Sequence, residues 1–145
     1  MDLSRHGRVL AAGVLLALAG CSQGDAPTLA DTQGVVTFKG RPLDSANISF
    51  VPESGPIAVG VTDADGRFSL TTYGKPGAPI GVCRIAIQAH GVHPPGFKPP
   101  VDSSGETGYV EPPWRIPKIY GTIQSSGLTA TIEAGKLNDV PITLK

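Results

Sequence analysis

The chain has few cysteines, few aromatic residues and no excess of charge of either sign. Lysine and arginine together number 12, as do aspartate and glutamate, so the formal net charge at pH 7 is zero. Proteins bind nucleic acid mainly through Lys and Arg contacts to phosphates, and no basic cluster is present. Nucleic acid is therefore not an expected partner. Two cysteines are also too few for a disulfide framework.

Helical patterns are missing as well. After residue 20, no window of the sequence shows the 3.6-residue periodicity of an amphipathic helix. Instead, 19 glycines and 14 prolines separate short runs rich in β-branched and aromatic residues, which is the pattern of strands joined by turns. The 145 residues allow one domain. The sequence predicts an all-β sandwich of about seven strands.

One apolar run, Val9–Ala19, needs a separate explanation. A membrane-spanning helix requires about 20 apolar residues, so this run is too short to span and fits the apolar part of a secretory signal. It ends in Leu18-Ala19-Gly20-Cys21, which resembles the lipobox of bacterial lipoproteins. The resemblance implies cleavage between Gly20 and Cys21 and lipidation of the Cys21 thiol. The alternative is an ordinary signal peptide in which Cys21 is incidental.

The lipobox reading divides the chain into three parts. Residues 1–20 form the signal peptide, residues 21–33 form a lipidated cysteine with a flexible polar tether, and residues 34–145 form the β-sandwich domain. Acyl chains stabilise membrane binding by about 0.8 kcal/mol per buried methylene, so lipid on Cys21 makes the membrane a partner. Ser22 after the cysteine favours the outer membrane within the cell envelope.

The stretch Gly60 to Thr72, GVTDADGRFSLTT, predicts a hairpin at the centre of the domain. Apolar residues alternate on both sides of Asp63-Ala64-Asp65-Gly66, as in strands with one buried face. The turn needs a side-chain acceptor at its first position and positive φ at Gly66. A calcium loop of the EF-hand type is disfavoured because its twelfth position should be Glu, whereas Gly74 stands there.

Five segments in order, GVVTFKGRPLDSANISFVP, GVTDADGRFSLTT, GAPIGVCRIAIQ, IPKIY and SGLTATIEAG, resemble bacterial lipoproteins that carry a carboxypeptidase regulatory-like domain. The resemblance covers nearly all of the chain after the signal peptide. It implies a transthyretin-like sandwich, related to the immunoglobulin-like architecture, with no catalytic residues and no cofactor. Residues 90–117 depart from the pattern of that family.

The connection at residues 90–127 has no strand pattern and contains seven prolines and four of the eight aromatic residues. Connections of this length in compact domains are usually functional or disordered. Aromatic side chains beside a cation suit a sugar ring or a protein hot spot. The candidates for binding an envelope protein or carbohydrate are Phe97, Tyr109, Trp114, Arg115 and Tyr120. The alternative is that Trp114 and Tyr120 cap one end of the sandwich.

Catalytic motifs are not found: the sequence has no G-x-S-x-G, P-loop or H-E-x-x-H pattern. His90 and His93 form an H-x-x-H pair, but zinc needs three or four ligands, and Cys83 falls on the core-facing side of a strand. We therefore expect a non-catalytic binding or structural module without a metal. The alternative is a small transthyretin-like hydrolase or a metal-dependent enzyme that uses His90 and His93.

Overall fold

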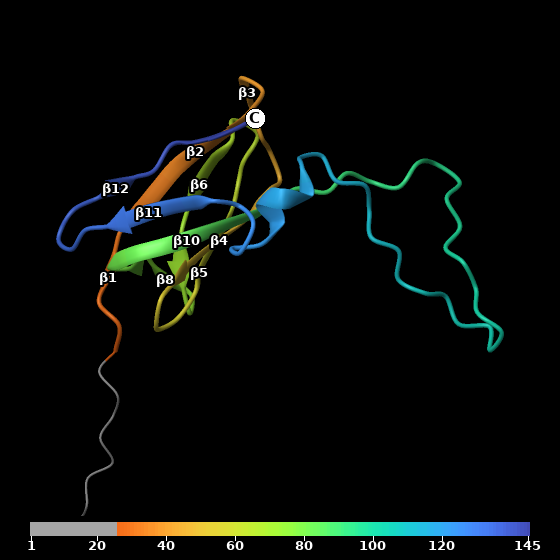
Figure 1. The fold of residues 1–145 in the computed structure, drawn as a ribbon, viewed down its shortest axis with the longest axis horizontal. Coiled ribbons are helices and arrows are strands. Elements are labelled where there is room, and N and C mark those ends of the chain that lie inside the picture. The colour runs from red at the N-terminus through yellow and green to blue at the C-terminus, as the bar shows by residue number, and fades with distance from the viewer. Residues whose placement is uncertain (1–25) are drawn as a thin grey trace, which may run out of the picture.

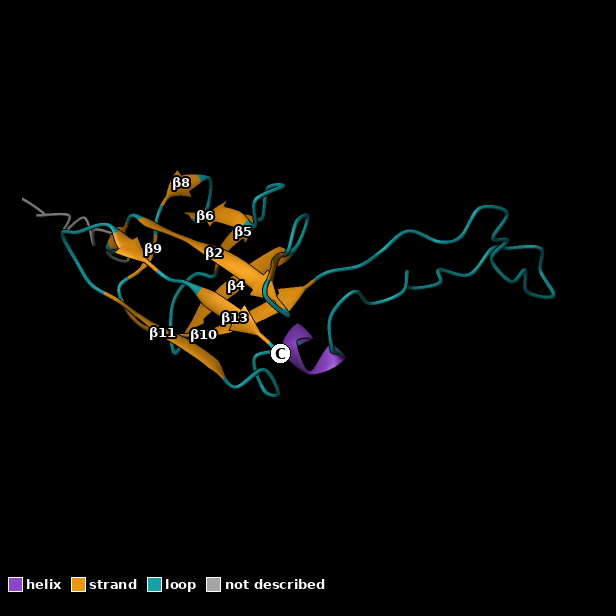
Figure 2. Cartoon of the chain, turned by 90° about the horizontal axis from the view of Figure 1, so that it is seen from above, coloured by secondary structure: helices purple, strands orange, loops and turns teal. Residues whose placement is uncertain are grey.

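The computed structural model describes residues 26–145, in which the regular structure is almost entirely β (Figures 1 and 2). One short 3-10 helix, η1 (Lys118–Gly121), precedes the C-terminal strands. The predicted all-β class is confirmed. The predicted cleavage and lipidation positions, Gly20 and Cys21, lie outside the described residues.

The larger sheet has six strands in the order β11-β10-β4-β5-β7-β8, and all their pairings are antiparallel. Its members are β4 (Asn47–Pro52), β5 (Ala58–Val61), β7 (Thr71–Thr72), β8 (Lys75–Pro76), β10 (Gly81–Gln88) and β11 (Leu128–Ile132). The neighbouring pair β1 (Leu29–Ala30) and β9 (Ala78–Pro79) lies where the chain enters β10.

The smaller sheet is built around β2 (Thr32–Phe38). On one side, β12 (Asn138–Asp139) and β13 (Ile142–Leu144) run parallel to β2. On the other side, β3 (Arg41–Pro42) and β6 (Arg67–Ser69) run antiparallel to it. Among the described strands, β12 and β13 pair with β2 alone. The last strand therefore lies at a sheet edge, where a proline such as Pro141, which lacks an N–H, is tolerated.

The hydrophobic core lies between these two sheets. Phe50 of β4 and Phe68 of β6 meet across it with ring centroids 6.2 Å apart, and both side chains are buried. The alternation predicted for β10 is confirmed: Cys83, Ile85 and Ile87 are buried, while the polar residues between and after them are exposed. Burying a large aliphatic or aromatic side chain contributes about 1.5–3 kcal/mol, so this layer provides much of the stability of the fold.

The central hairpin is only partly as predicted. Both strands and the turn are present, but β5 and β6 do not pair with each other. The chain from Arg67 to Thr72 crosses between the sheets instead: β6 pairs with β2, and β7 pairs with β5. The sequence pattern gave the buried face of β6, where Phe68 is buried, but not that of β5, where Val59 and Val61 are exposed and Ala58 is buried. It gave the neighbour of neither strand. We call residues 67–72 the crossing strand. A Cβ at Gly60 would lie 2.7 Å from the carbonyl oxygen of Ser69 in the crossing strand, so β5 can approach it this closely only with glycine at position 60.

The turn itself has the expected geometry. Asp63 Oδ1 accepts hydrogen bonds from the N–H groups of Asp65 and Arg67, both at 2.9 Å. Gly66 donates its N–H to the Asp63 carbonyl at 3.0 Å and has a φ of 74°. Asp65 therefore contributes its backbone N–H to the turn, whereas Asp63 contributes its carboxylate.

One predicted boundary is wrong. The tether expected over residues 21–33 is contradicted at residues 29–33, because β1 and the first part of β2 lie there. Thr32 is buried and donates its hydroxyl to the Ala30 carbonyl at 2.9 Å. These polar residues enter the sheet through backbone pairing with β12, which a hydropathy pattern does not reveal.

Gly66→Ala should lower the free energy of unfolding by clearly more than Gly74→Ala. Both glycines have a φ of 74°, so each substitution carries the cost of a left-handed backbone, about 1 kcal/mol. A Cβ at Gly66 would also lie 2.5 Å from the Val36 carbonyl oxygen, whereas nothing lies within 4 Å at Gly74. Urea unfolding of both variants measures the difference. Equal losses would contradict the close approach of this turn to β2.

Candidate functional site

Residues 90–115, here called the arm, project from the sandwich as two extended segments (Figures 1 and 2). The arm begins after the end of β10 and returns just before η1. Figure 1 shows β1 at the opposite end of the sandwich. The arm therefore extends away from the point where the described chain enters the fold.

Backbone hydrogen bonds join the two segments of the arm at its base, and further out as well. They run from Arg115 N to Ala89 O (2.9 Å), from Gly91 N to Pro113 O (2.8 Å), from Gly108 N to Pro100 O (3.2 Å) and from Asp102 N to Glu106 O (2.9 Å). Proline has no N–H to donate, so the prolines of the arm leave this ladder incomplete. The arm is consequently a projection whose two segments are joined by hydrogen bonds but form no regular strands.

The tip of the arm repeats the turn found at Asp63. Asp102 Oδ1 accepts from the N–H groups of Ser104 and Glu106, both at 2.9 Å, and from the Ser104 hydroxyl at 2.7 Å. Gly105 donates to the Asp102 carbonyl at 3.1 Å and has a φ of 84°. The Ser104 hydrogen bond is the main cause of a lowered pKa at Asp102. The sequence analysis did not predict this turn. Its pattern, Asp-x-x-Gly, is present at Asp102–Gly105, but no alternating apolar residues flank it to indicate strands.

The two histidines of the H-x-x-H pair stabilise the arm through different contacts. His93 stacks on Phe97 with ring centroids 3.9 Å apart and planes within 5°, and its Nε2 lies 3.0 Å from the Val110 carbonyl oxygen on the other segment. His90 packs against Trp114 instead, with centroids 4.4 Å apart. Among residues 26–145, no group of three or more His, Cys, Asp or Glu side chains is placed to hold a metal ion.

Trp114 lies at the base of the arm, where it packs partly buried against the hydrophobic core. The outer edge of its indole ring, at Cη2, lies so close to Gly121 that any Cβ there would overlap it. The indole N–H is buried and has no hydrogen-bond partner among the described residues. Tyr120 also packs on the core, and its hydroxyl accepts from the N–H of Lys145 at 3.2 Å. Both aromatic residues thus occupy the positions that the capping alternative predicts.

Arg115 joins the base of the arm to the segment between β3 and β4. Its Nη2 lies 2.6 Å from Asp44 Oδ1, and its Nη1 donates to the Asp44 carbonyl at 2.9 Å. The hydrogen bond from Arg115 is the main cause of a lowered pKa at Asp44. Arg115 is therefore engaged within the protein and is not an open cation beside Trp114.

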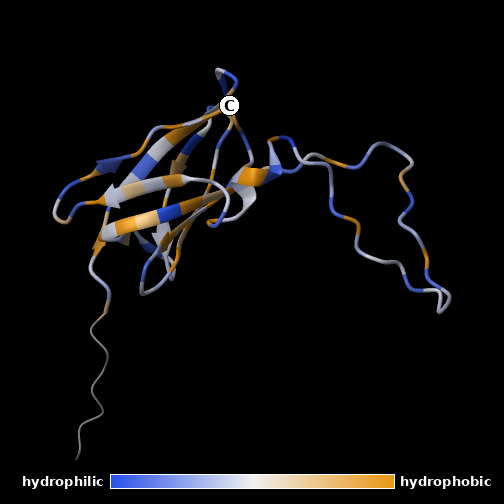
Figure 3. Cartoon of the chain, in the orientation of Figure 1, coloured by the Kyte–Doolittle hydropathy of each residue, from blue (hydrophilic) through white to orange (hydrophobic). Residues whose placement is uncertain are grey.

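Phe97 and Tyr109 occupy different surroundings from the other three candidates. The Tyr109 side chain is 87% exposed and that of Phe97 is 39% exposed. Val92 and Val101 are exposed nearby on the arm, and Figure 3 shows apolar residues along both segments. The five predicted binding residues therefore divide into an exposed pair on the arm and a packed group at its base.

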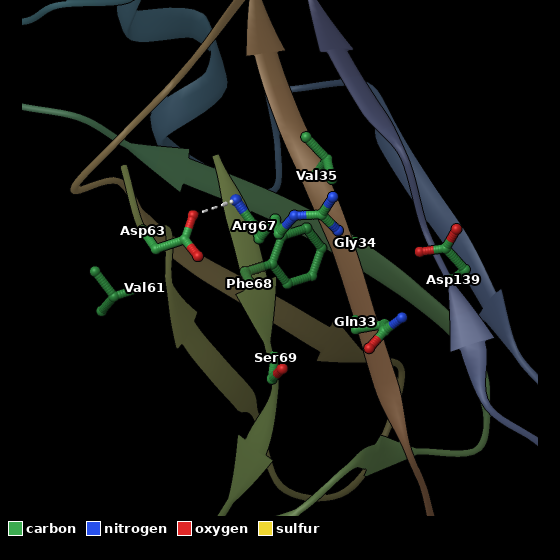
Figure 4. Close-up of a pocket in the computed structure, with 9 residues that line it drawn as sticks. All are labelled: Gln33, Gly34, Val35, Val61, Asp63, Arg67, Phe68, Ser69 and Asp139. Carbon is green, nitrogen blue, oxygen red and sulfur yellow. Dashed lines mark hydrogen bonds between the residues drawn. The ribbon is translucent and has the colours of Figure 1, made fainter. Parts of the chain in front are cut away.

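A second candidate is a shallow hollow of about 380 Å³ on the outer face of the smaller sheet (Figure 4). In Figure 4, the Arg67 side chain lies over β2 between Asp63 and Asp139. The remaining lining residues are Gln33, Gly34, Val35, Val61, Phe68 and Ser69. The hollow offers hydrogen-bonding groups but no exposed aromatic face, and Asp63 already serves the turn. The arm is therefore the stronger candidate.

Cys83 is a core residue, as the sequence predicted. Its side chain is fully buried, and its Sγ lies 3.8 Å from the Pro79 carbonyl oxygen. Burial raises the pKa of the thiol, which keeps it protonated and a poor nucleophile.

Comparison of the chain with known protein families, with characterised proteins and with solved structures found no match. A helix with the length and apolarity to cross a membrane is not found within residues 26–145. The candidate site consequently rests on its geometry alone.

Gly121→Ala should displace the indole ring of Trp114, because the new methyl group overlaps it. The chain has one tryptophan, so its emission spectrum reports this ring directly. We expect a red shift together with a loss of about 1–3 kcal/mol in stability, as for other overpacked sites. Gly91→Ala is the matched control, because its Cβ would make only ordinary contacts, the nearest at 3.6 Å. Identical spectra for both variants would show that Trp114 does not pack on Gly121.

Proposed function

We propose that this protein is a lipid-anchored lipoprotein of the cell envelope, located at the outer membrane, whose β-sandwich is a non-catalytic binding module. The arm contacts an envelope protein or glycan. The lipid anchor rests on the resemblance of Leu18-Ala19-Gly20-Cys21 to a lipobox. One observation carries the binding role: the arm extends from the end of the sandwich opposite β1 (Figure 1), and the ring of Tyr109 is exposed to solvent.

The direction of the arm matters because of where the proposed anchor is attached. Leu29 follows Cys21 by eight residues in the sequence, and a fully extended chain of that length reaches about 28 Å at most. Lipid on Cys21 therefore keeps the β1 end of the sandwich near the bilayer. The arm, at the other end, then faces away from the anchoring membrane and towards other components of the envelope.

The chemistry of the arm supports a contact role. Tyrosine offers a flat apolar face with a polar tip, which suits stacking on sugar rings and protein hot spots. Prolines and the hydrogen bonds between the two segments restrict the backbone of the arm before any partner binds. Binding therefore costs less conformational entropy than it would for a free loop.

We also propose that the sandwich belongs to the transthyretin-like class, as the resemblance to carboxypeptidase regulatory-like domains implies. Segments that continue one another along the chain combine into seven longer strands: 29–38, 47–52, 58–61, 67–72, 78–88, 128–132 and 138–144. Two further segments, β3 and β8, have two residues each. The proposal takes the seven longer strands as the strands of the sandwich and treats β3 and β8 as parts of turns.

Tyr109→Ala should weaken retention of the protein on isolated envelope material at least fivefold, because the variant removes the exposed ring. A fivefold loss corresponds to about 1 kcal/mol, which is the threshold of an interface residue that matters. Tyr73→Ala is the matched control, since Tyr73 is 84% exposed and lies between β7 and β8, away from the arm.

The measurement is co-sedimentation with purified envelope glycan and, separately, with envelope protein. A loss with one material assigns the class of partner. If Tyr109→Ala and Tyr73→Ala bind both materials as the unchanged protein does, the arm is not the contact surface.

Cys21→Ser should abolish membrane anchoring, because the hydroxyl cannot replace the thiol that is proposed to carry the lipid. Detergent phase partitioning measures this. The serine variant is expected as unprocessed precursor or as a form in the aqueous phase. A variant that still enters the detergent phase at the size of the mature protein would contradict the lipoprotein assignment.

A further inference from the structure

Strand β11 forms one edge of the larger sheet (Figure 1). It pairs along its whole length with β10, from Leu128 opposite Ile85 to Ile132 opposite Gly81. Among the described residues, no strand lies on its other side. Leu128 and Ala130 pack against the core but are only partly buried, which is the consequence of this missing neighbour.

The other sheet edges carry features that prevent pairing with another chain. Natural edge strands are usually short, or they carry lysine, proline or a bulge. Edge strand β8 consists of Lys75 and Pro76 alone, and the β12–β13 edge is interrupted at Pro141 and carries Asp139. On the opposite edge of the smaller sheet, β3 consists of Arg41 and Pro42, and β6 has three residues and carries Arg67. Strand β11 has five residues with no charge and no proline, and its register with β10 is continuous. It is therefore the unprotected edge of the described fold.

We infer that β11 pairs with β11 of a second copy of this chain, antiparallel and centred on Ala130. The sequence Leu128-Thr129-Ala130-Thr131-Ile132 has the same order of residue classes in both directions. Antiparallel pairing about Ala130 places Thr129 opposite the partner's Thr131 on the exposed face. The same register places Leu128 opposite the partner's Ile132 on the core face.

This register satisfies the chemistry of both faces. Thr–Thr pairs across an antiparallel ladder are favourable, and both threonines are exposed and available. On the inner face, the partner strand covers the partly buried Leu128 and Ala130, and the unpaired backbone groups of both edges bond to each other. One pair of short strands is a small interface, so the dimer is weak and forms only at high protein concentration. The inference depends on neither the arm nor the lipid anchor.

Two double variants test the register. Thr129→Glu with Thr131→Glu places like charges opposite each other across the pair, which is destabilising. Thr129→Glu with Thr131→Lys places opposite charges there. Both variants carry the same Glu opposite Arg84 of β10 and differ only at position 131, opposite Val82, so their effects on the single chain are similar. The first is expected to abolish the dimer and the second to retain it.

The measurement is sedimentation equilibrium of the full chain in a density-matched detergent, at the highest concentration that remains soluble. The unchanged protein is expected to show a dimer at that concentration. A monomer there, or identical behaviour of the two double variants, overturns the inference. Loss of the dimer in both variants overturns it too, because the antiparallel register predicts that opposite charges are tolerated.

A disulfide gives an independent test that also traps a weak dimer. In the inferred register, Ala130 faces the partner's Ala130 directly, at a Cβ separation that a disulfide can bridge after small adjustment. Ala130→Cys should therefore give a covalent dimer on non-reducing gels, whereas Thr143→Cys on the β13 edge and the unchanged protein should not. No covalent dimer with Ala130→Cys, or equal amounts with Thr143→Cys, contradicts the pairing.

Discussion

The fold depends on the close contact between the turn at Gly66 and strand β2. Val36 donates its N–H to the Gly66 carbonyl at 2.8 Å, and only a glycine fits against the Val36 carbonyl oxygen in this left-handed conformation. This contact starts the crossing strand that begins at Arg67 and serves both sheets in turn. Because one continuous strand joins the two sheets on this side, the sandwich is held together there by backbone hydrogen bonds as well as by its core.

A turn of the same type at Asp102 has a different consequence, because no sheet lies beside it for the chain to join. The hydrogen bonds around Asp63 and Asp102 are alike, but a Cβ at Gly66 meets β2 whereas nothing lies near Gly105. A closed turn without a neighbouring sheet leaves a projection, and the prolines along it prevent the two segments from forming a regular ladder. The arm is thus a hairpin-like element that leaves Val92, Val101 and Tyr109 exposed.

The sequence predicted the buried faces of most strands better than their neighbours, although the face of β5 that carries Val59 and Val61 is exposed. Alternation identified Ile85 and Ile87 as core residues because a period of two determines which face is buried. It could not reveal that β6 pairs with β2, since pairing depends on the whole topology. The polar strand at Thr32 was missed because it enters the sheet through its backbone. Trp114 and Tyr109 were grouped by their position in the sequence, whereas the two lie in different surroundings on the arm.

The base of the arm shows why its direction is fixed mainly by packing. The buried indole N–H of Trp114 makes no hydrogen bond among the described residues, and such a group costs about 1–3 kcal/mol. The fold retains it because the ring contacts His90, on the first segment of the arm, and Gly121 of η1, outside the arm. These contacts connect the arm to the end of the sandwich. A partner that binds at Tyr109 therefore meets an arm whose orientation is already determined by the core.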